Sequence, residues 1–400
     1  MGTLAEDLTA RTRAFVAEHV LGVDDEFDGD VNAAGGEALR VRLQESARAA
    51  GVFAPQVARE FGGHGLGMVD RSGPLEEAGY SLFGPIATNV GAPDEGNIHM
   101  LEAIASADQR TRFLEPLARG LVRSAFAMTE PAPGAGADPS ALRTRAVRGD
   151  GGWVITGEKR FITGAEGAGF FIVMARTSGE PGGAGAGGAG GATMFLVPAD
   201  TPGLRVGRHL PTVDRAMLGG HCEVHLEGVV VGEDAVLGEV DLGFRYAQVR
   251  LGPARMTHVM RWTGAARRAH ETAVAYVAGR EAFGGRISDL GLAQQHIADN
   301  EIDLAATRAL LRTACEELDA GGRASESTSI AKTFAAEALD RVVDRSQQLC
   351  GGLGVTADLP VAKIARELRP FRIYDGPSEV HRWSIAKRAV KRITSQAGPA

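Results

Sequence analysis

One carboxylate, Asp375, has a sequence context that suits chemistry. It lies in Tyr374–Ser378, where Asp-Gly-Pro is typical of a tight turn. The apolar residues that follow recur close to the 3.6-residue period of an α-helix. Asp375 or Ser378 could therefore simply cap that helix, whereas a carboxylate in a pocket with little water can act as a general base. The local sequence leaves both interpretations open.

Two histidines and a cysteine near residue 220 suggest, at first sight, a metal site. His221, Cys222 and His225 lie in a segment that alternates between polar and apolar residues, as a half-buried strand does. Alternation places Cys222 on the opposite face from His221, so we predict no bound metal. The other cysteines, Cys315 and Cys350, are far away in the chain and form no CxxC pair. A reducing compartment fits this pattern.

The glycine-rich segment Gly182–Gly191 contains GxGxxG by chance. A dinucleotide fingerprint needs a strand before the glycines and a helix that begins on them. Here Ser178–Pro181 precedes the glycines, and a strand-like run follows. We predict a flexible low-complexity loop between two strands.

Three successive blocks must position these residues. Residues 1–121 are rich in Ala and Leu and indicate helices, residues 122–240 contain short β-type runs, and residues 241–400 return to long helical patterns. This order predicts three consecutive domains and not a βαβ array. The clearest expected strands are 153–156, 170–174, 193–197 and 222–227, and the clearest expected helices are 244–279, 292–320 and 327–350.

Composition excludes several classes of function. The 400 residues carry 43 Lys and Arg against 50 Asp and Glu, a formal net charge of −7, with no long basic block. We therefore expect no nucleic-acid partner. No run approaches 18 apolar residues, so no membrane span is expected. The first residues lack the apolar core of a signal peptide, and we expect a cytoplasmic protein.

Four separated segments, taken together and in order, resemble the acyl-CoA dehydrogenase family over nearly the whole chain. They are Phe126–Pro131, Gly157–Ala165, Arg280–Gly284 and Gln348–Gly354, the last leading to the turn at Asp375. Taken singly, each has an ordinary explanation, such as a loop, a strand end, a helix surface or a helix C-cap. Arg250–Met256 and Asp375–His381 are similar to the branch that includes animal dehydrogenases fused to a kinase domain.

The resemblance implies an α+β fold, with an N-terminal helical domain, a middle β-barrel or β-sandwich domain and a C-terminal four-helix bundle. It also implies FAD as the cofactor. Met128 and Thr129 would contact the pyrimidine edge of the flavin, and Thr163 would approach its N5 atom. Phe161 would form an aromatic wall, for which stacking needs only a π face.

Further FAD contacts are implied in the C-terminal domain. Arg280 and Phe283 match the pair that holds the pyrophosphate and the adenine, and the Arg fork suits phosphate. Gln348, Gly351 and Gly352 match a segment that reaches FAD in a neighbouring subunit, where glycines let the backbone approach closely. A site shared in this way implies a homodimer or a homotetramer.

The resemblance also gives Asp375 a role. Common family members have Glu at this position, and Asp is shorter by one C–C bond, about 1.5 Å. Asp375 would take the α-proton of an acyl thioester while the β-hydride leaves for flavin N5. Arg255 is expected to bind the substrate or to orient the base, and Tyr374 and Gly376 are expected to line the substrate site.

The sequence therefore predicts an FAD-dependent acyl-CoA dehydrogenase of fatty acid metabolism. It would convert an acyl-CoA to a trans-2-enoyl thioester and pass the electrons to electron-transfer flavoprotein. Two alternatives keep the fold: a nitroalkane oxidase, which also uses Asp as the base, and an acyl-carrier-protein dehydrogenase of a biosynthetic pathway. A flavin-binding scaffold without activity is the remaining alternative.

Overall fold

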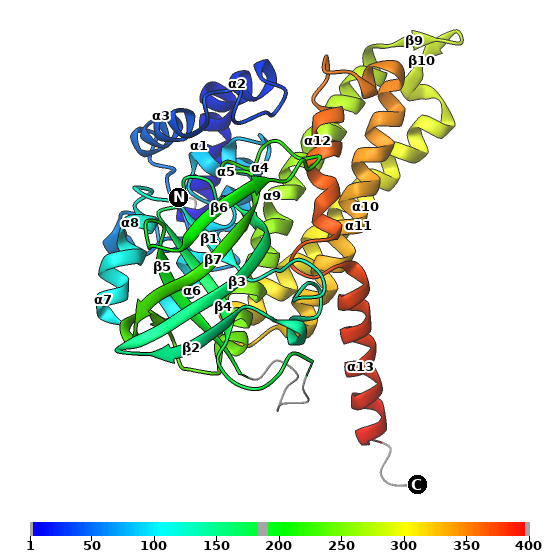
Figure 1. Cartoon of the computed structure of the whole chain (residues 1–400). Helices are drawn as coiled ribbons and strands as arrows, with labels where there is room; N and C mark the ends of the chain where they lie inside the picture. Colours follow the sequence, from blue (N-terminus) through cyan, green and yellow to red (C-terminus); the bar gives the residue numbers. More distant parts are fainter. Residues whose placement is uncertain (1–2, 183–190, 397–400) are drawn as a thin grey trace. The chain divides into compact units, whose positions relative to one another are not determined.

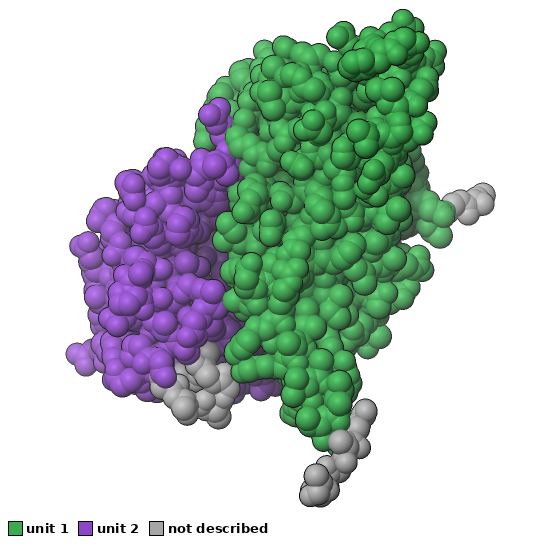
Figure 2. Space-filling view, turned by 90° about the vertical axis from the view of Figure 1, so that its right-hand side faces the viewer, with its two compact units in different colours: residues 1–56, 66–88, 252–400 green, residues 57–65, 89–251 purple. Residues whose placement is uncertain are grey.

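The chain divides into two compact units, which a computed structural model describes over residues 3–182 and 191–396. Unit 1 comprises residues 1–56, 66–88 and 252–400, and unit 2 comprises residues 57–65 and 89–251 (Figure 2). The two units group the residues differently from the three predicted domains, 1–121, 122–240 and 241–400, whose boundaries stay a prediction. The predicted glycine-rich loop falls largely on residues 183–190, which lie outside the described residues.

Unit 2 is built around one eight-stranded sheet, in the order β6-β7-β3-β2-β4-β5-β8, with β1 paired to β4 (Figure 1). Most neighbours are antiparallel, and β1 and β2 are parallel to β4. The strands are β1 Ser124–Ala127, β2 Arg145–Gly149, β3 Gly152–Thr163, β4 Phe170–Arg176, β5 Ala192–Pro198, β6 Leu204–His209, β7 His221–Gly232 and β8 Val236–Leu237. The helices of this unit include α6 Asp94–Ile104, α7 Ala107–Gln109 and α8 Glu115–Ala118.

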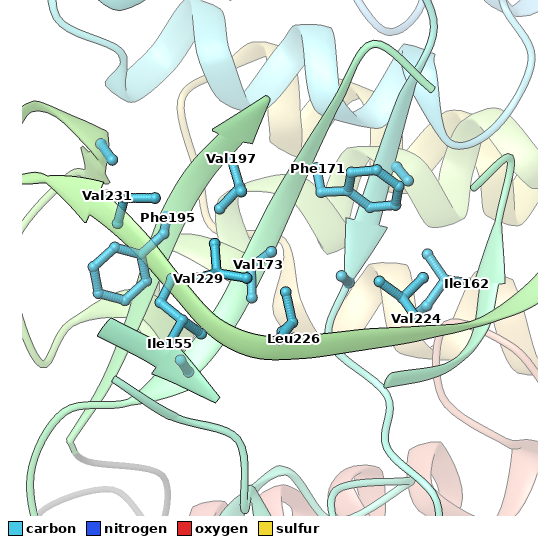
Figure 3. Packing of buried hydrophobic residues seen from close by; sticks show 14 of the residues in the cluster. Ile155, Ile162, Phe171, Val173, Phe195, Val197, Val224, Leu226, Val229 and Val231 are labelled. Carbon is cyan, nitrogen blue, oxygen red and sulfur yellow. The ribbon is translucent and has the colours of Figure 1, made fainter. Parts of the chain in front are cut away.

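The core of unit 2 follows from the strand pattern. Every residue of β4 is buried, as its continuous apolar run predicts for a strand covered on both faces. In β7, residues alternate between buried and partly exposed over His221–Leu226. Their buried faces meet in one apolar cluster (Figure 3) that includes Ile155, Phe171, Val173, Phe195, Val224 and Leu226.

Unit 1 is helical. Its N-terminal helices are α1 Leu4–Phe15, α2 Leu21–Glu26, α3 Gly36–Ala49, α4 Ser72–Gly79 and α5 Gly84–Ala87. Its C-terminal helices are α9 Gly243–Gly279, which belongs to this unit from residue 252, α10 Gly291–Asp319, α11 Ser325–Cys350, α12 Val361–Leu368 and α13 Ser378–Gln396. Helix α11 packs against α10, α12 and α13 (Figure 1).

Helices α4 and α9 approach each other closely because glycines face the contact. A β-carbon at Gly264 would lie 2.0 Å from the carbonyl oxygen of Glu76, so only glycine fits there. Arg267 of α9 then reaches the Glu77 carboxylate, with its Nη2 2.7 Å from Oε2. This contact fixes α9, the helix that carries Arg255.

The predicted secondary structure is confirmed at the elements that matter for the site. The expected strands lie within β3, β4, β5 and β7, and the expected helices match α9, α10 and α11. No helix in the described part of the chain combines the length and the apolar character that crossing a membrane needs.

Candidate active site

Asp375 lies in a left-handed turn of unit 1. Its φ is +53°, and Gly376 follows at +96°. A non-glycine residue at positive φ is uncommon and marks a turn or a strained functional position. Helix α13 begins at Ser378, which puts the N-cap at position 377, so the capping role considered for Asp375 and Ser378 falls on neither residue.

Three side chains hold the carbonyl groups of this turn. Arg255 Nε donates to the Asp375 carbonyl oxygen at 3.0 Å, and His381 Nε2 donates to the same oxygen at 3.1 Å. Lys332 Nζ donates to the Gly376 carbonyl oxygen at 2.7 Å. The predicted base-orienting residue, Arg255, therefore contacts the backbone of the predicted base.

Burial shifts the pKa of two of these groups. It lowers the pKa of His381 to about 4, and the nearby cations Arg255 and Lys332 add to this effect. It also lowers the pKa of Lys332 to about 8, although the Asp375 carboxylate opposes the shift. Near pH 7, His381 is therefore neutral and Lys332 is mostly charged.

His258 of α9 is one of the site residues that were not predicted from the sequence. Its Nε2 lies 3.4 Å from Asp375 Oδ2, and Arg261 Nη2 lies 3.0 Å from its Nδ1. His258 follows Arg255 by three residues, so the two side chains share one face of the helix. The helical period, applied to the predicted Arg255, would have pointed to it.

Aromatic packing fixes Tyr374. Trp262 Nε1 donates to the Tyr374 hydroxyl oxygen at 2.5 Å. The Tyr374 ring lies 4.8 Å from the His258 ring and 5.5 Å from the Phe371 ring, measured between centroids. The substrate-binding role of Tyr374 and of Gly376 stays a prediction.

In unit 2, the structure brings the predicted flavin-edge residues together. Met128 and Thr129 follow β1, and Phe161 and Thr163 end β3. The Arg160 N–H donates to the Thr129 carbonyl oxygen at 2.9 Å, which ties the two segments to each other.

A buried ion pair supports these segments. Lys159 Nζ lies 2.9 Å from Glu130 Oε1 and donates to the carbonyl oxygens of Met128, at 3.2 Å, and Met174, at 2.7 Å. Burial lowers the pKa of Lys159 to about 8, and Glu130 opposes that shift. The Glu130 carboxylate also accepts the backbone N–H of Thr144 at 2.8 Å. Loop and strand are thus held at one point.

Phe161 presents an aromatic face from a strained backbone. Its φ is +56°, at a bulge between Lys159 and Ile162, and 54% of its surface is exposed. Positive φ in a bulky residue is costly, by roughly 1–3 kcal/mol. An exposed aromatic ring held at that cost suits a planar ligand.

Thr163 belongs to a chain of hydrogen bonds. Its Oγ1 lies 2.9 Å from His221 Nδ1, and His221 Nε2 lies 2.7 Å from Asp214 Oδ2. Burial alone would raise the pKa of Asp214, but the hydrogen bond from His221 holds it below its usual value. Asp214 is therefore an ionised acceptor.

His221, Cys222 and His225 do not come together as one metal site. Cys222 Sγ is buried and contacts the Gly219 carbonyl oxygen at 3.6 Å, while His221 is engaged by Thr163 and Asp214. His225 instead lies with Glu158 and Glu223, whose ligand atoms are all within 4.8 Å of one another. Because Arg208 Nη2 lies 3.2 Å from Glu223 Oε1, we propose no metal there.

The predicted adenine-side residues are exposed on unit 1. Phe283 and Gly284 form the two-residue turn between β9 Glu281–Ala282 and β10 Gly285–Arg286 (Figure 1), with φ of +56° and +85°. Such turns favour Asn-Gly, yet here a Phe that is 92% exposed occupies the first position. Arg280, which precedes this hairpin, is exposed as well.

The end of α11 presents a bare backbone. Gln348 is exposed, and Gly351 has a φ of +56°. A β-carbon at Gly351 or Gly352 would meet no described atom within 4 Å. The Gly351 N–H bonds the Gln348 carbonyl oxygen, so what this exposed end offers to a ligand or to another chain is close approach to a backbone without side chains.

Comparison with known proteins identifies the family. Three family models, the N-terminal, middle and C-terminal domains of acyl-CoA dehydrogenase, match residues 4–121, 125–229 and 241–390. The chain belongs to the acyl-CoA dehydrogenase family. It is 35% identical to the probable acyl-CoA dehydrogenase FadE2 of Mycobacterium tuberculosis, over 99% of this chain and 97% of that protein.

Two further proteins show similarity over nearly the whole chain. Mouse acyl-CoA dehydrogenase family member 11 is 34% identical over 98% of this chain, which covers only 51% of that protein. This match agrees with the branch predicted from the sequence. A solved glutaryl-CoA dehydrogenase of Mycobacterium smegmatis, in complex with FADH2, has a TM-score of 0.84 and 25% identity, over 97% of this chain and 95% of that one.

This member of the acyl-CoA dehydrogenase family is thus an FAD-dependent oxidoreductase, and the predicted α+β fold is confirmed. Its residues fit the cofactor in kind. Phe161 offers an exposed π face, Arg280 is an exposed cation, and Gly351 and Gly352 offer backbone without side chains. Their individual contacts to FAD remain predictions.

Proposed function

We propose that this acyl-CoA dehydrogenase converts an acyl-CoA to a trans-2-enoyl-CoA, with Asp375 as the base. The α-carbon would lose a proton to the Asp375 carboxylate, the β-carbon would lose a hydride, and a double bond would form between them. The observation that carries this proposal is the setting of Asp375. Its side chain keeps only 17% exposure, in a strained turn whose carbonyls Arg255, His381 and Lys332 hold.

The shorter side chain of Asp375 makes its backbone position important. A misplacement of about 1 Å can cost about 10²-fold in rate. The left-handed turn sets the direction of the Cα–Cβ bond, and Arg255, His381 and Lys332 fix the carbonyls on both sides of Gly376. Preorganisation of this kind suits a general base, which contributes about 10²–10⁴-fold.

When bound, FAD supplies the acceptor for the β-hydride. We assign the flavin edge to Met128, Thr129 and Thr163, and the aromatic wall to Phe161. We assign the pyrophosphate and adenine to Arg280 and Phe283. A neighbouring subunit would add Gln348, Gly351 and Gly352, which makes a homodimer or a homotetramer the expected assembly. Electron-transfer flavoprotein is the proposed electron acceptor, and a cytoplasmic location fits the reducing compartment that the cysteines suggest.

Anaerobic mixing tests this function. The holoenzyme is mixed with a panel of acyl-CoA substrates, and the absorbance of oxidised flavin is followed. Bleaching with at least one substrate is expected, and its absence across all chain lengths would overturn the proposal. Asp375→Asn should abolish bleaching while FAD remains bound. The matched control is Asp70→Asn, which removes an exposed carboxylate of the same unit.

The same assay separates the alternatives. Oxygen consumption with a nitroalkane, without bleaching by any acyl-CoA, would indicate a nitroalkane oxidase. Bleaching by an acyl-carrier-protein thioester but not by the CoA thioester would indicate a biosynthetic dehydrogenase. Retained reduction in Asp375→Asn would exclude Asp375 as the base whatever the substrate.

A further inference from the structure

We infer that His258 is a positioning residue that directs an N–H at the Asp375 carboxylate and does not take up the proton that Asp375 abstracts. This inference rests on the proposed function, because it assumes that Asp375 is the base. The partners of the imidazole decide which of its two nitrogens carries the hydrogen.

Arg261 determines which nitrogen of His258 carries the proton. A guanidinium has donors and no acceptor, so Arg261 Nη2, at 3.0 Å, must donate to His258 Nδ1. A neutral imidazole has one donor and one acceptor. Since Nδ1 accepts, the hydrogen lies on Nε2, the atom that is 3.4 Å from Asp375 Oδ2. The two atoms are close but not hydrogen-bonded at this distance, and we expect the contact to tighten when a substrate binds.

Packing holds the ring in this orientation. His258 is buried, and its ring centroid lies 4.8 Å from that of Tyr374 and 5.9 Å from that of Phe371. Its neighbours on α9 reinforce the arrangement, because Arg255 and Arg261 lie three residues before and after it. A rotation that exchanged Nδ1 and Nε2 would point the hydrogen at a cation.

The polarity has one consequence for the proton that Asp375 would abstract. After proton abstraction, His258 has no vacant nitrogen, because Nε2 holds a hydrogen and Nδ1 accepts from Arg261. The proton that Asp375 takes up therefore cannot pass on to His258.

Other charged or titratable groups bond the backbone of the Asp375 turn or His258 itself, and their effects must be separated from that of His258 in any pH profile. They are Arg255 and Arg261 from α9, Lys332 from α11, and His381 from α13. The pKa of His381 is lowered to about 4 and that of Lys332 to about 8, chiefly by burial. Between about pH 5 and pH 7, neither of these two groups changes charge, and the acid limb reports on Asp375 with His258.

The test compares two substitutions of His258. In His258→Phe the ring remains without its N–H, and in His258→Gln an amide N–H remains at that end. The acid-limb midpoint of anaerobic flavin reduction should rise by about one to two pH units in the Phe variant, because a donor to the charged form is lost. The Gln variant should stay close to the parent, and His270→Gln on the same helix is the matched control.

A second measurement needs no turnover. Infrared difference titration of the holoenzyme, with Asp375→Asn to assign the carboxyl band, should show the same upward shift in His258→Phe. If that variant does not fold, Arg261→Met replaces it. Without the donor to Nδ1, His258 can hold two hydrogens, and the midpoint should instead move down.

The outcomes distinguish this inference from the proposed function. An unchanged midpoint in His258→Phe, or equal shifts in the Phe and Gln variants, would overturn the positioning role even if Asp375→Asn is inactive. An upward shift in Arg261→Met would overturn it as well. Retained reduction in Asp375→Asn would instead remove the proposed base itself.

Discussion

The turn at Asp375 in unit 1 and the Thr163 end of β3 in unit 2 contain the same kinds of groups. Their histidines, however, have hydrogen-bond partners of opposite charge. Each has a residue at positive φ, Asp375 or Phe161, and each has a buried lysine whose pKa is lowered to about 8. Each also has an imidazole against a predicted site residue, His258 against Asp375 and His221 against Thr163.

The second partner of each histidine decides which ring nitrogen donates and which one accepts. Arg261 donates to His258, so the far nitrogen of that ring presents its hydrogen to Asp375. Asp214 accepts from His221 Nε2, so a His221 ring that carries one hydrogen presents a lone pair at Nδ1 and accepts from the Thr163 hydroxyl. The oxygen of Thr163 is then an acceptor toward a ligand. A cation or an anion behind a histidine therefore decides what the next residue can do.

The lysines differ in their partners, and this difference predicts the largest effect. Lys159 pairs with the buried Glu130, so Lys159→Met should lower the free energy of unfolding by about 3–5 kcal/mol. Lys332 instead donates to the uncharged Gly376 carbonyl oxygen, and Lys332→Met should lower the free energy of unfolding by about 1–3 kcal/mol. Urea denaturation of the two variants measures the difference between their free energies of unfolding.

The control is the double variant Lys159→Met with Glu130→Gln. Because Gln carries no charge, the double variant should recover part of the loss. Equal losses of unfolding free energy in Lys159→Met and Lys332→Met would show that the pairing with Glu130 does not make Lys159 more costly to remove than Lys332.

The pH dependence of stability should reveal Lys332 separately. Its pKa is about 8 in the folded protein and 10.5 in the reference state. Between these values the unfolded chain binds more protons, so stability rises with pH from about 8 to about 10.5, by up to about 1.4 kcal/mol per pH unit. Urea denaturation at pH 8, 9 and 10 should give a smaller slope for Lys332→Met. An unchanged slope would contradict the lowered pKa.

The sequence predicts the helices and strands of the site, but not the hydrogen bonds between its side chains. Strand alternation and helical period predicted β3, β7 and α9, because they reflect burial along a single element. Asp375, Phe161 and Phe283 were found through motifs, and all three are among the eight described non-glycine residues at positive φ. His258 and Asp214 were not predicted, because their roles depend on Arg261 and His221, and side-chain direction is a tertiary property.

Relief of strain at Phe161 should separate stability from cofactor binding. Phe161→Gly removes the cost of positive φ and should stabilise the protein without FAD by about 1 kcal/mol. FAD affinity should fall by roughly two- to tenfold, since an aromatic contact is worth about 0.5–1.5 kcal/mol. Melting of the FAD-free protein and fluorescence titration with FAD measure the two effects. Weaker stability with unchanged affinity would make Phe161 a structural residue.

The smallest expected effect is on the midpoint potential of bound FAD, and its sign is what tests the role of His221. Asn at position 214 can donate to His221 Nε2, which moves the ring hydrogen to Nδ1 and frees the Thr163 hydroxyl to donate to a ligand. Reduced flavin carries hydrogen on N5, so an accepting Thr163 favours the reduced form and a donating Thr163 favours the oxidised form. On the proposed placement of Thr163, Asp214→Asn should lower the midpoint potential of bound FAD by about 10–30 mV, equivalent to about 0.5–1.5 kcal/mol.

Loss of charge alone would act in the other direction. Removing a negative group near the flavin makes electron addition easier and raises the potential, so the sign of the shift separates reversed polarity from simple electrostatics. Asp200→Asn, an exposed carboxylate of unit 2, is the control for charge and should leave the potential unchanged. A raised potential in Asp214→Asn would mean that His221 does not control the direction of the Thr163 hydrogen bond. The difference between His221 and His258 would then not affect the cofactor.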